Sequence, residues 1–163
     1  MRHDLTRSLL VCIVLAISVA DALAAAEKVS LDKLPKAVSA ALKSKFPDAK
    51  LTSAEKETVD GKTVFNVALN FKDHDHDVRL TDDGKITRTG KAISGRDLPT
   101  KVAKALIDKY PRGTNKKVVE VTTDKAVTYE ILLLTGDQRL LDLQVDSDGK
   151  VLKETERKEE KKP

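Results

Sequence analysis

The most evident candidate chemistry lies in a short run of alternating acidic and imidazole side chains, Asp73-His74-Asp75-His76-Asp77. In an extended segment, His74 and His76 project to the same face and bring two imidazoles close enough to share a transition metal. The aspartates are available as oxygen ligands or as groups that orient the imidazoles. Two histidines are half of a typical site, and the run is expected in a hairpin loop. A solvated loop is the simpler interpretation, and a weak zinc, copper or nickel site is the alternative.

A second acidic run, Asp146-Ser147-Asp148-Gly149, begins like a calcium-binding loop. The rest of the segment departs from that pattern, because Lys150 stands where an oxygen ligand is needed and Arg157 occupies the twelfth position. The run is therefore predicted to be a hairpin turn, in which aspartate and glycine supply the turn geometry.

Motifs of the common enzyme classes do not occur in the sequence. It has no Gly-x-Ser-x-Gly, no His-Glu-x-x-His and no phosphate-binding glycine loop, and its single cysteine, Cys12, lies in an N-terminal apolar segment. The net charge is only +4, and the three Phe and two Tyr residues are not interleaved with basic ones, which argues against nucleic-acid binding. We therefore predict a protein that is not an enzyme and has no cofactor.

The first 26 residues are typical of a secretory signal peptide. A positively charged start precedes an apolar segment over Leu9–Val19, and Ala24-x-Ala26 fits a signal-peptidase site. That segment is shorter than the roughly 20 residues of a membrane span, although a retained anchor is the alternative. Cleavage predicts a periplasmic or secreted protein with no membrane span and no cysteine.

An internal repeat organises the rest of the chain. Four motifs occur twice in the same order: Leu34-Pro35-x-x-Val38 and Leu98-Pro99-x-x-Val102, Phe46-Pro47 and Tyr110-Pro111, Phe65–Leu69 and Tyr129–Leu133, and Asp83–Ile86 and Asp148–Val151. The first three are offset by 64 positions (98 − 34) and the fourth by 65 (148 − 83). This spacing predicts one structural unit built twice, over 31–92 and 97–157, within one domain of residues 27–157. The charged segment 158–163 is predicted to be a disordered tail.

Each copy is predicted to open with a helix of about 12–14 residues. Apolar side chains recur on one side of the first helix, at Leu34, Val38, Ala41 and Leu42, and the second copy has the same stripe. Asp32 and Asp97 are expected to cap the two helices by accepting hydrogen bonds from first-turn amides. Pro47 and Pro111 end the helices, because proline cannot continue one.

The remainder of each copy alternates apolar and polar residues, as half-buried antiparallel strands do. Strands are predicted over 50–59, 62–71, 77–81 and 85–92 in the first copy and over 115–123, 126–134, 139–145 and 151–157 in the second. One such unit of about 60 residues would be marginally stable alone, so the two are expected to join. We therefore predict an α+β fold, a tandem repeat of helix plus four strands with one shared antiparallel sheet and both helices on one face.

The opposite face of that sheet is expected to be open and mostly polar. Leu132 and Leu134 are exceptions, because the alternation places these apolar residues on the open face. They could pack beneath the tail or a neighbouring loop, or they could contact a partner protein. The candidate partner-binding residues on this face are Arg79, Glu130, Leu132 and Leu134.

The repeated motifs resemble the PepSY-like family, in the branch described as beta-lactamase-inhibitor-like. The resemblance rests on the Leu-Pro, aromatic-Pro and Asp-Gly-Lys-Ile/Val motifs and spans about residues 31–154. It implies an exported bacterial protein with a concave sheet. The inhibitors for which the branch is named grip an enzyme with such a sheet, so the resemblance implies a non-enzymatic binding module that contacts or inhibits another envelope or secreted protein. No inhibitory residue is carried over, because this chain lacks the disulfides and aromatic-rich surface of those inhibitors.

Two functions are thus kept open. The first is the exported binding module that uses the open face of its sheet to contact a protein partner. The alternative is a periplasmic metal-binding protein that uses His74 and His76 within the Asp73–Asp77 run.

Overall fold

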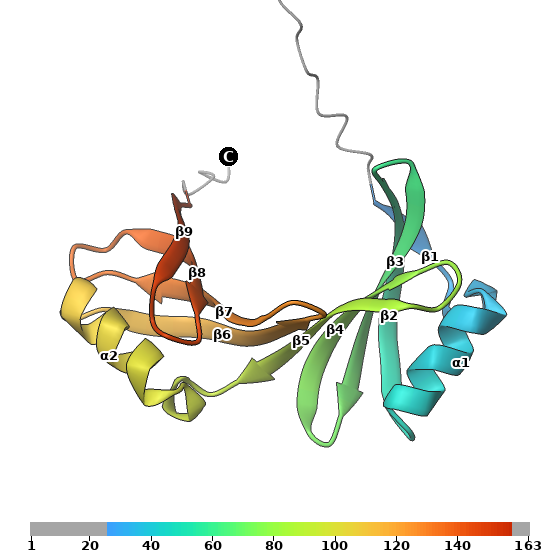
Figure 1. Cartoon of the computed structure of the whole chain (residues 1–163), viewed down its shortest axis with the longest axis horizontal. Coiled ribbons are helices and arrows are strands. Elements are labelled where there is room, and N and C mark those ends of the chain that lie inside the picture. Colours follow the sequence, from blue (N-terminus) through green and yellow to red (C-terminus); the bar gives the residue numbers. More distant parts are fainter. Residues whose placement is uncertain (1–25, 158–163) are drawn as a thin grey trace, which may run out of the picture.

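The computed structural model describes residues 26–157, which form an α+β fold with two α-helices and a single nine-stranded antiparallel sheet (Figure 1). The helices are α1 (Lys36–Lys45) and α2 (Thr100–Lys109). The strands are β1 (Glu27–Val29), β2 (Lys50–Val59), β3 (Lys62–Phe71), β4 (His74–Thr81), β5 (Ile86–Ile93), β6 (Thr114–Thr123), β7 (Val127–Leu134), β8 (Leu140–Asp146) and β9 (Val151–Glu156). They lie in the sheet in chain order. The predicted α+β class and antiparallel sheet are confirmed.

Two predictions concern parts of the chain outside the described residues. The signal peptide predicted over 1–26 lies outside them apart from its last residue, and the tail predicted over 158–163 lies outside them entirely. Within residues 26–157, neither helix combines the length and the apolar character that crossing a bilayer requires.

The start of the first helix differs from the prediction. Asp32 lies in a separate 3-10 turn, η1 (Leu31–Lys33), and α1 begins only at Lys36. Leu34 is extended between them, with φ −62° and ψ 140°, because the residue before a proline is disfavoured in helical angles. The prediction that Asp32 caps α1 is therefore wrong, and the helix has 10 residues rather than 12–14.

The second helix starts in the same way. The 3-10 turn η2 (Gly95–Asp97) precedes α2, and the extended Leu98 separates the two. Asp97 does act as a capping residue, but for η2: its carboxylate accepts a hydrogen bond from the Ser94 amide at 3.2 Å, in a reciprocal capping box. Asp97 therefore fixes the chain direction before α2 rather than capping α2 itself.

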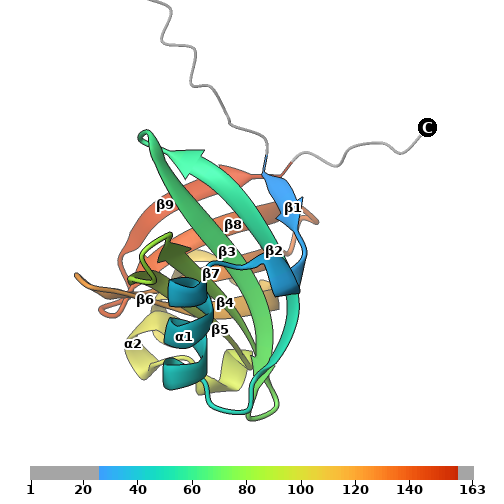
Figure 2. The same cartoon turned by 90° about the vertical axis from the view of Figure 1, so that its right-hand side faces the viewer.

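Two apolar cores hold the helices to the sheet. The first joins α1 to strands β2–β4 and consists of Leu34, Val38, Leu42, Phe46, Ala54, Phe65, Val67, Leu69, Val78 and Leu80. The second joins α2 to strands β6–β8 and consists of Leu98, Val102, Leu106, Val118, Tyr129, Ile131, Leu133, Leu141, Leu143 and Val145. The predicted helix stripes supply the helical part of both cores. Figure 2 shows α1 lying along the strands of the first core.

Two strands depart from the prediction by more than the one-residue shifts seen at the ends of β5 to β9. β4 begins at His74 rather than at residue 77, so the His/Asp run lies mostly in a strand and only Asp73 remains in the turn. Asp73 and Lys72 form this turn with positive φ values of 61° and 51°. The short strand β1 was not predicted, because a strand of three residues is too short to show alternation.

The two halves of the sheet meet where β5 pairs with β6. Six residue pairs connect these strands, from Arg88 opposite Thr123 to Ile93 opposite Val118. The sheet is curved, and Figure 1 shows β1–β3 at one end and β8–β9 at the other bent toward the same side. The β5–β6 pairing therefore places side chains of both halves on one continuous surface.

The edges of the sheet are β1 and β9. β1 has only three residues, whereas β9 has six and exposes Leu152 to 49%. Lys153, Glu154 and Glu156 are also exposed along β9. Charged residues on an edge strand discourage pairing with another chain.

The repeated Asp-Gly turns fit closely against the helices. Gly84 has φ +86°, and a Cβ built there would lie 2.6 Å from the backbone O of Ala37 in α1. Gly149 has φ +89°, and its Cβ would lie 2.7 Å from the backbone O of Lys101 in α2. Gly61 has φ +73° in the β2–β3 turn, but nothing lies within 4 Å of its Cβ position. The glycines of the repeat are therefore required for close approach as well as for turn geometry.

We predict that Gly84→Ala destabilises the protein more than Gly61→Ala does. Both substitutions strain a left-handed residue, which costs about 1–2 kcal/mol, but only Gly84→Ala also pushes the turn away from α1, for a total of about 2–4 kcal/mol. Urea unfolding followed by circular dichroism measures both free energies of unfolding. Equal losses for the two variants would contradict the close-approach argument.

Candidate functional site

In each half of the sheet, the side that faces away from the core is called the open face, and polar side chains lie along it. Along β3 and β7, these residues alternate with buried core residues. Asn66, Ala68, Asn70, Arg79, Thr81, Glu130 and Gln144 are all half-buried rather than fully exposed. Ion pairs and cross-strand contacts between neighbouring side chains account for much of this burial.

In the first half of the sheet, Arg79 is held by groups on neighbouring strands. Its Nε donates a hydrogen bond to Asn66 Oδ1 at 2.8 Å, and its guanidinium forms an ion pair with Glu57 Oε1 at 2.8 Å. Asn66 lies directly opposite Arg79 in the β3–β4 pairing. The predicted partner-binding residue Arg79 is therefore oriented by two residues of its own half, Asn66 on β3 and Glu57 on β2.

A second arginine, Arg88 on β5, joins the two halves across the open face. It forms ion pairs with Asp77 on β4 and, at 2.7 Å, with Glu130 on β7. Since β6 lies between β5 and β7, the Arg88 side chain spans that strand. Burial opposes the charge of the guanidinium, but the two carboxylates outweigh it and raise the pKa of Arg88 above its ordinary value.

Gly90 makes room for this network. It lies opposite Asp77 in the β4–β5 pairing, and a Cβ at position 90 would collide with the Asp77 carboxylate. The missing side chain lets Asp77 lie over β5 and reach Arg88. A glycine inside a predicted strand often marks such an approach, so Gly90 was the signal in the sequence that could have revealed the network.

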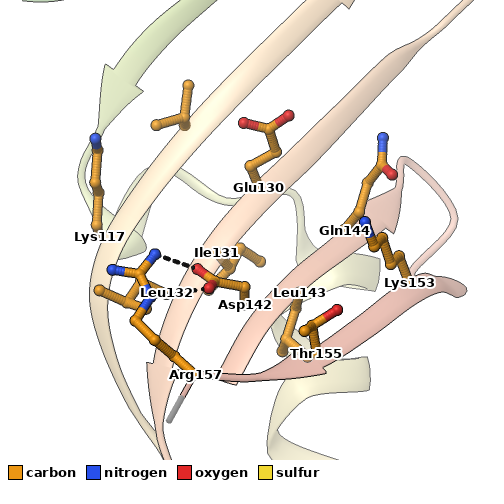
Figure 3. A pocket seen from close by; sticks show the side chains of 11 residues that line it. Lys117, Glu130, Ile131, Leu132, Asp142, Leu143, Gln144, Lys153, Thr155 and Arg157 are labelled. Atoms are coloured by element: carbon orange, nitrogen blue, oxygen red, sulfur yellow. Dashed lines mark hydrogen bonds and ion pairs between the residues drawn. The ribbon is translucent and has the colours of Figure 1, made fainter. Parts of the chain in front are cut away.

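The open face is hollowed over strands β6–β9 (Figure 3). The hollow has a volume of about 510 Å³ and is lined by Lys117, Val119, Glu130, Ile131, Leu132, Asp142, Leu143, Gln144, Lys153, Thr155 and Arg157. Arg157 clamps Asp142 with two hydrogen bonds, of 3.0 Å from Nε and 2.9 Å from the terminal nitrogen. The volume is within the roughly 300–1,000 Å³ of ligand and side-chain pockets.

The hollow gathers two of the four predicted partner-binding residues. Glu130 and Leu132 line it, and Leu134 lies further along β7, opposite Leu140 of β8. Arg79 lies in the first half and does not line the hollow. Leu132 is half-buried beside Lys117 and Asp142, which lie opposite it on the adjacent strands.

Several residues of this surface were not singled out from the sequence. Lys117, Asp142, Lys153 and Arg157 meet at the hollow only through the pairing of β6 to β9. Charged residues that alternate with apolar ones look like any solvated strand face in the sequence. Their convergence depends on strand register, which the alternation pattern leaves undetermined.

His74 and His76 lie on β4, on the side of the first core. His74 Nδ1 lies 3.1 Å from the carbonyl O of Ala92 and donates to it. The His76 ring packs against Phe46 and Phe71, at centroid distances of 5.3 and 6.2 Å.

Within residues 26–157, no group of three or more His, Cys, Asp or Glu side chains is placed to hold a metal ion. Metal binding by the two histidines stays a prediction.

The imidazole of His76 is held in a mainly apolar environment. Burial lowers its pKa below the ordinary value of 6.5, and the positive charge of Lys91, which lies opposite it on β5, lowers the pKa further. The negative charges of Asp75 and Asp77 raise the pKa of His76, but their effect is smaller. Its Nδ1 is buried without a hydrogen-bond partner among the described residues.

The fold and this surface define a class of protein: an α+β module in which two helices pack on a curved antiparallel sheet that leaves a charged face open. The chain belongs to the family described as "Putative beta-lactamase-inhibitor-like, PepSY-like", whose profile matches residues 23–88 and again residues 67–153. The resemblance inferred from the repeated motifs is thus confirmed. No curated protein sequence matches the chain.

Solved structures from Bacteroides species are similar to this chain. One, from Bacteroides eggerthii and described as "putative periplasmic proteins", is 17% identical with a TM-score of 0.65, and the match covers 75% of this chain and 88% of that one. A "BLIP-like protein" from Bacteroides fragilis is 18% identical with a TM-score of 0.59, over 78% and 92% of the two chains. A "DUF2874 family protein" from Bacteroides ovatus is 18% identical with a TM-score of 0.63, over 75% and 86%. These likenesses establish the fold.

We predict that Arg88→Ala lowers the free energy of unfolding by about 1 kcal/mol, because it removes two ion pairs and the packing of the arginine stem over β6. Arg139→Ala is the matched control. Arg139 also pairs with two carboxylates, Asp137 and Glu156, but its side chain is 50% exposed against 24% for Arg88. The control should change stability by less than about 0.5 kcal/mol. Urea unfolding at low and high salt measures both, and equal effects would count against a bridging role for Arg88.

We predict that His76 makes stability fall as the pH falls below about 6.5. Because the pKa of His76 is lowered in the folded protein, the unfolded chain takes up the proton at a higher pH than the folded one does. The free energy of unfolding therefore rises with pH up to about 6.5, and the stabilising contribution of His76 is fully present above that pH. His76→Phe should flatten the free energy of unfolding between about pH 7.5 and 5.5. Urea unfolding at successive pH values tests this. Parallel curves for wild type and His76→Phe would contradict it.

Proposed function

We propose that this protein is an exported, non-enzymatic binding module that contacts another envelope or secreted protein through the open face of its sheet, and that inhibits or chaperones that partner. The observation that carries this proposal is the hollow over β6–β9, where the apolar side chain of Leu132 lies among charged residues. Apolar surface inside a polar rim is the usual composition of a protein-binding site.

The proposal includes the arrangement predicted from the repeat, with two units and both helices on the same face of the sheet. The strand register supports it. Val78 of the first core lies opposite Thr89 on β5, and Ile93 is four residues further on the same side of that strand. Ile93 lies opposite Val118 of the second core. The side chains that connect the first core to the second are therefore proposed to lie on one face of the sheet. The other face is then free for a partner.

The polar groups of the open face favour binding over catalysis. Glu130 is paired with Arg88, and Asp142 is clamped by Arg157. Both carboxylates are engaged by a guanidinium, so neither is placed to exchange a proton with a substrate. Pre-oriented charges of this kind are suited to the recognition of a charged partner.

The proposed location is the periplasm or the extracellular space. The signal-peptide pattern of residues 1–26 supports export. The Bacteroides eggerthii structure is described as periplasmic, and the Bacteroides fragilis structure as BLIP-like. These descriptions, together with the family to which the chain belongs, agree with an exported protein that binds another protein.

We predict that Leu132→Asp reduces partner capture by at least about tenfold, which corresponds to about 1.4 kcal/mol of binding free energy. The matched control is Ile107→Asp, because Ile107 is 70% exposed on α2, away from the open face. Immobilised protein is incubated with envelope extract, and cross-linked partners are quantified by mass spectrometry. Folding of both variants is checked by urea unfolding.

Two results would contradict the proposal. Capture that is equal for Leu132→Asp and wild type would mean that the open face is not the binding surface. Capture that disappears in the metal chelator EDTA would instead favour the alternative of a metal-dependent function at His74 and His76. Under the proposed function, capture persists in EDTA and in His74→Ala.

A further inference from the structure

The charges that line the hollow over β6–β9 are not balanced. Five charged residues line it, of which Glu130 and Asp142 are acidic and Lys117, Lys153 and Arg157 are basic. Both acidic groups already have a guanidinium partner: Glu130 is paired at 2.7 Å with Arg88, and Asp142 at 2.9 Å with Arg157. The negative charges of the hollow are therefore neutralised from within the molecule.

The two lysines remain. Within residues 26–157, neither Lys117 nor Lys153 forms an ion pair. Both are exposed, Lys117 on β6 and Lys153 on β9. Figure 3 shows them on opposite sides of the hollow, with Leu132 and Asp142 between them. The hollow thus presents two separated positive charges for which residues 26–157 supply no matching negative charge.

The surface between the lysines is partly apolar. Leu132 lies opposite Lys117 in the β6–β7 pairing, and the buried Val119 is next along β6 on the same face. An occupant that satisfies both features carries negative charges at its ends and an aliphatic side chain between them. A hollow of about 510 Å³ has room for a few side chains of such a segment.

We propose that this hollow receives an acidic loop of the partner protein, with carboxylates directed to Lys117 and Lys153 and an aliphatic side chain placed on Leu132. This inference rests on the proposed function and specifies the chemistry of the partner. The lysines speed the encounter and select an acidic surface, and the burial of Leu132 slows dissociation.

Other occupants match the hollow less well. A nucleic acid would bring phosphates against Glu130 and Asp142, and no aromatic side chain lines the hollow for a base to stack on. A small anion would be bound best by converging donors, whereas the two lysines stand apart on either side of Leu132 (Figure 3). A protein loop is the occupant that can reach both lysines and cover the leucine at once.

The test uses a defined probe, a cyclic peptide of sequence Gly-Glu-Ser-Leu-Ser-Glu-Gly, added to isotope-labelled protein from Glu27 onward, which contains every described element. We expect saturable NMR shift changes confined to β6–β9, with a Kd of about 1 mM or below at low salt. The same peptide with Gln in place of both Glu residues should bind at least about tenfold more weakly, and raising the ionic strength should weaken binding of the acidic peptide.

Variants of the protein then test whether the two lysines cause the binding of the acidic peptide. Lys117→Glu/Lys153→Glu should abolish binding of the acidic peptide. Lys36→Glu/Lys43→Glu changes the net charge equally on the exposed side of α1 and should bind like wild type. Urea unfolding establishes that both double variants are folded, and Lys117→Gln/Lys153→Gln gives the same comparison without charge reversal.

Any of four peptide-binding results would overturn the proposal: equal binding of the Glu and Gln peptides, shift changes outside β6–β9, binding that survives in both Lys117/Lys153 variants, or the same shifts with orthophosphate. A wild-type dimer that dissociates on lysine reversal would assign the hollow to a second copy of this chain and would also overturn it. Capture that depends on Leu132 but not on the two lysines would leave the proposed function standing and reject only the acidic loop.

Discussion

The pairing of β5 with β6 is the constraint on which the rest of the structure depends. Each helix covers strands of its own half, and across the junction Ile93 of β5 packs against the second core. A separate unit of about 60 residues would bury little of its surface and be marginally stable. Six residue pairs between β5 and β6 make the two halves one sheet, and only in that sheet can Arg88 reach Glu130 across β6. The ion pair from Arg88 to Glu130, a residue that lines the hollow, therefore depends on this junction.

The sequence predicts most of this fold because its repeated residues have structural roles. The helix stripes, the prolines after the helices, the alternating strands and the Asp-Gly turns all lie where expected. The prediction fails where one local preference overrides another: Leu34 and Leu98 precede prolines, so each expected helix is divided into a 3-10 turn and a shorter α-helix. It also places the start of β4 too late, because Asp73–Asp77 has the composition of a loop although strand pairing extends it from His74.

The sequence predicts on which side of the sheet the candidate site lies, but it does not predict which of its side chains contact one another. Alternation alone assigns Arg79, Glu130 and Leu132 to the side opposite the cores. It does not reveal that Arg88 and Glu130 meet, since they are 42 residues apart in the chain and on strands that are not adjacent. Lys117 and Lys153 are likewise related only by the register of four strands. Their role as the unmatched charges becomes evident only after the partners of Glu130 and Asp142 are known.

The free edges of the sheet have a consequence for solution behaviour. A sheet whose strands follow chain order ends in two different strands, so pairing of β9 with β1 of another copy would be head-to-tail. Such pairing generates linear filaments wherever the rotation from copy to copy does not close a ring. The three residues of β1 offer few hydrogen bonds, and the charges of β9 repel an incoming strand. Filament growth is thus opposed mainly by a few side chains on one strand, whose protection weakens as salt screens them.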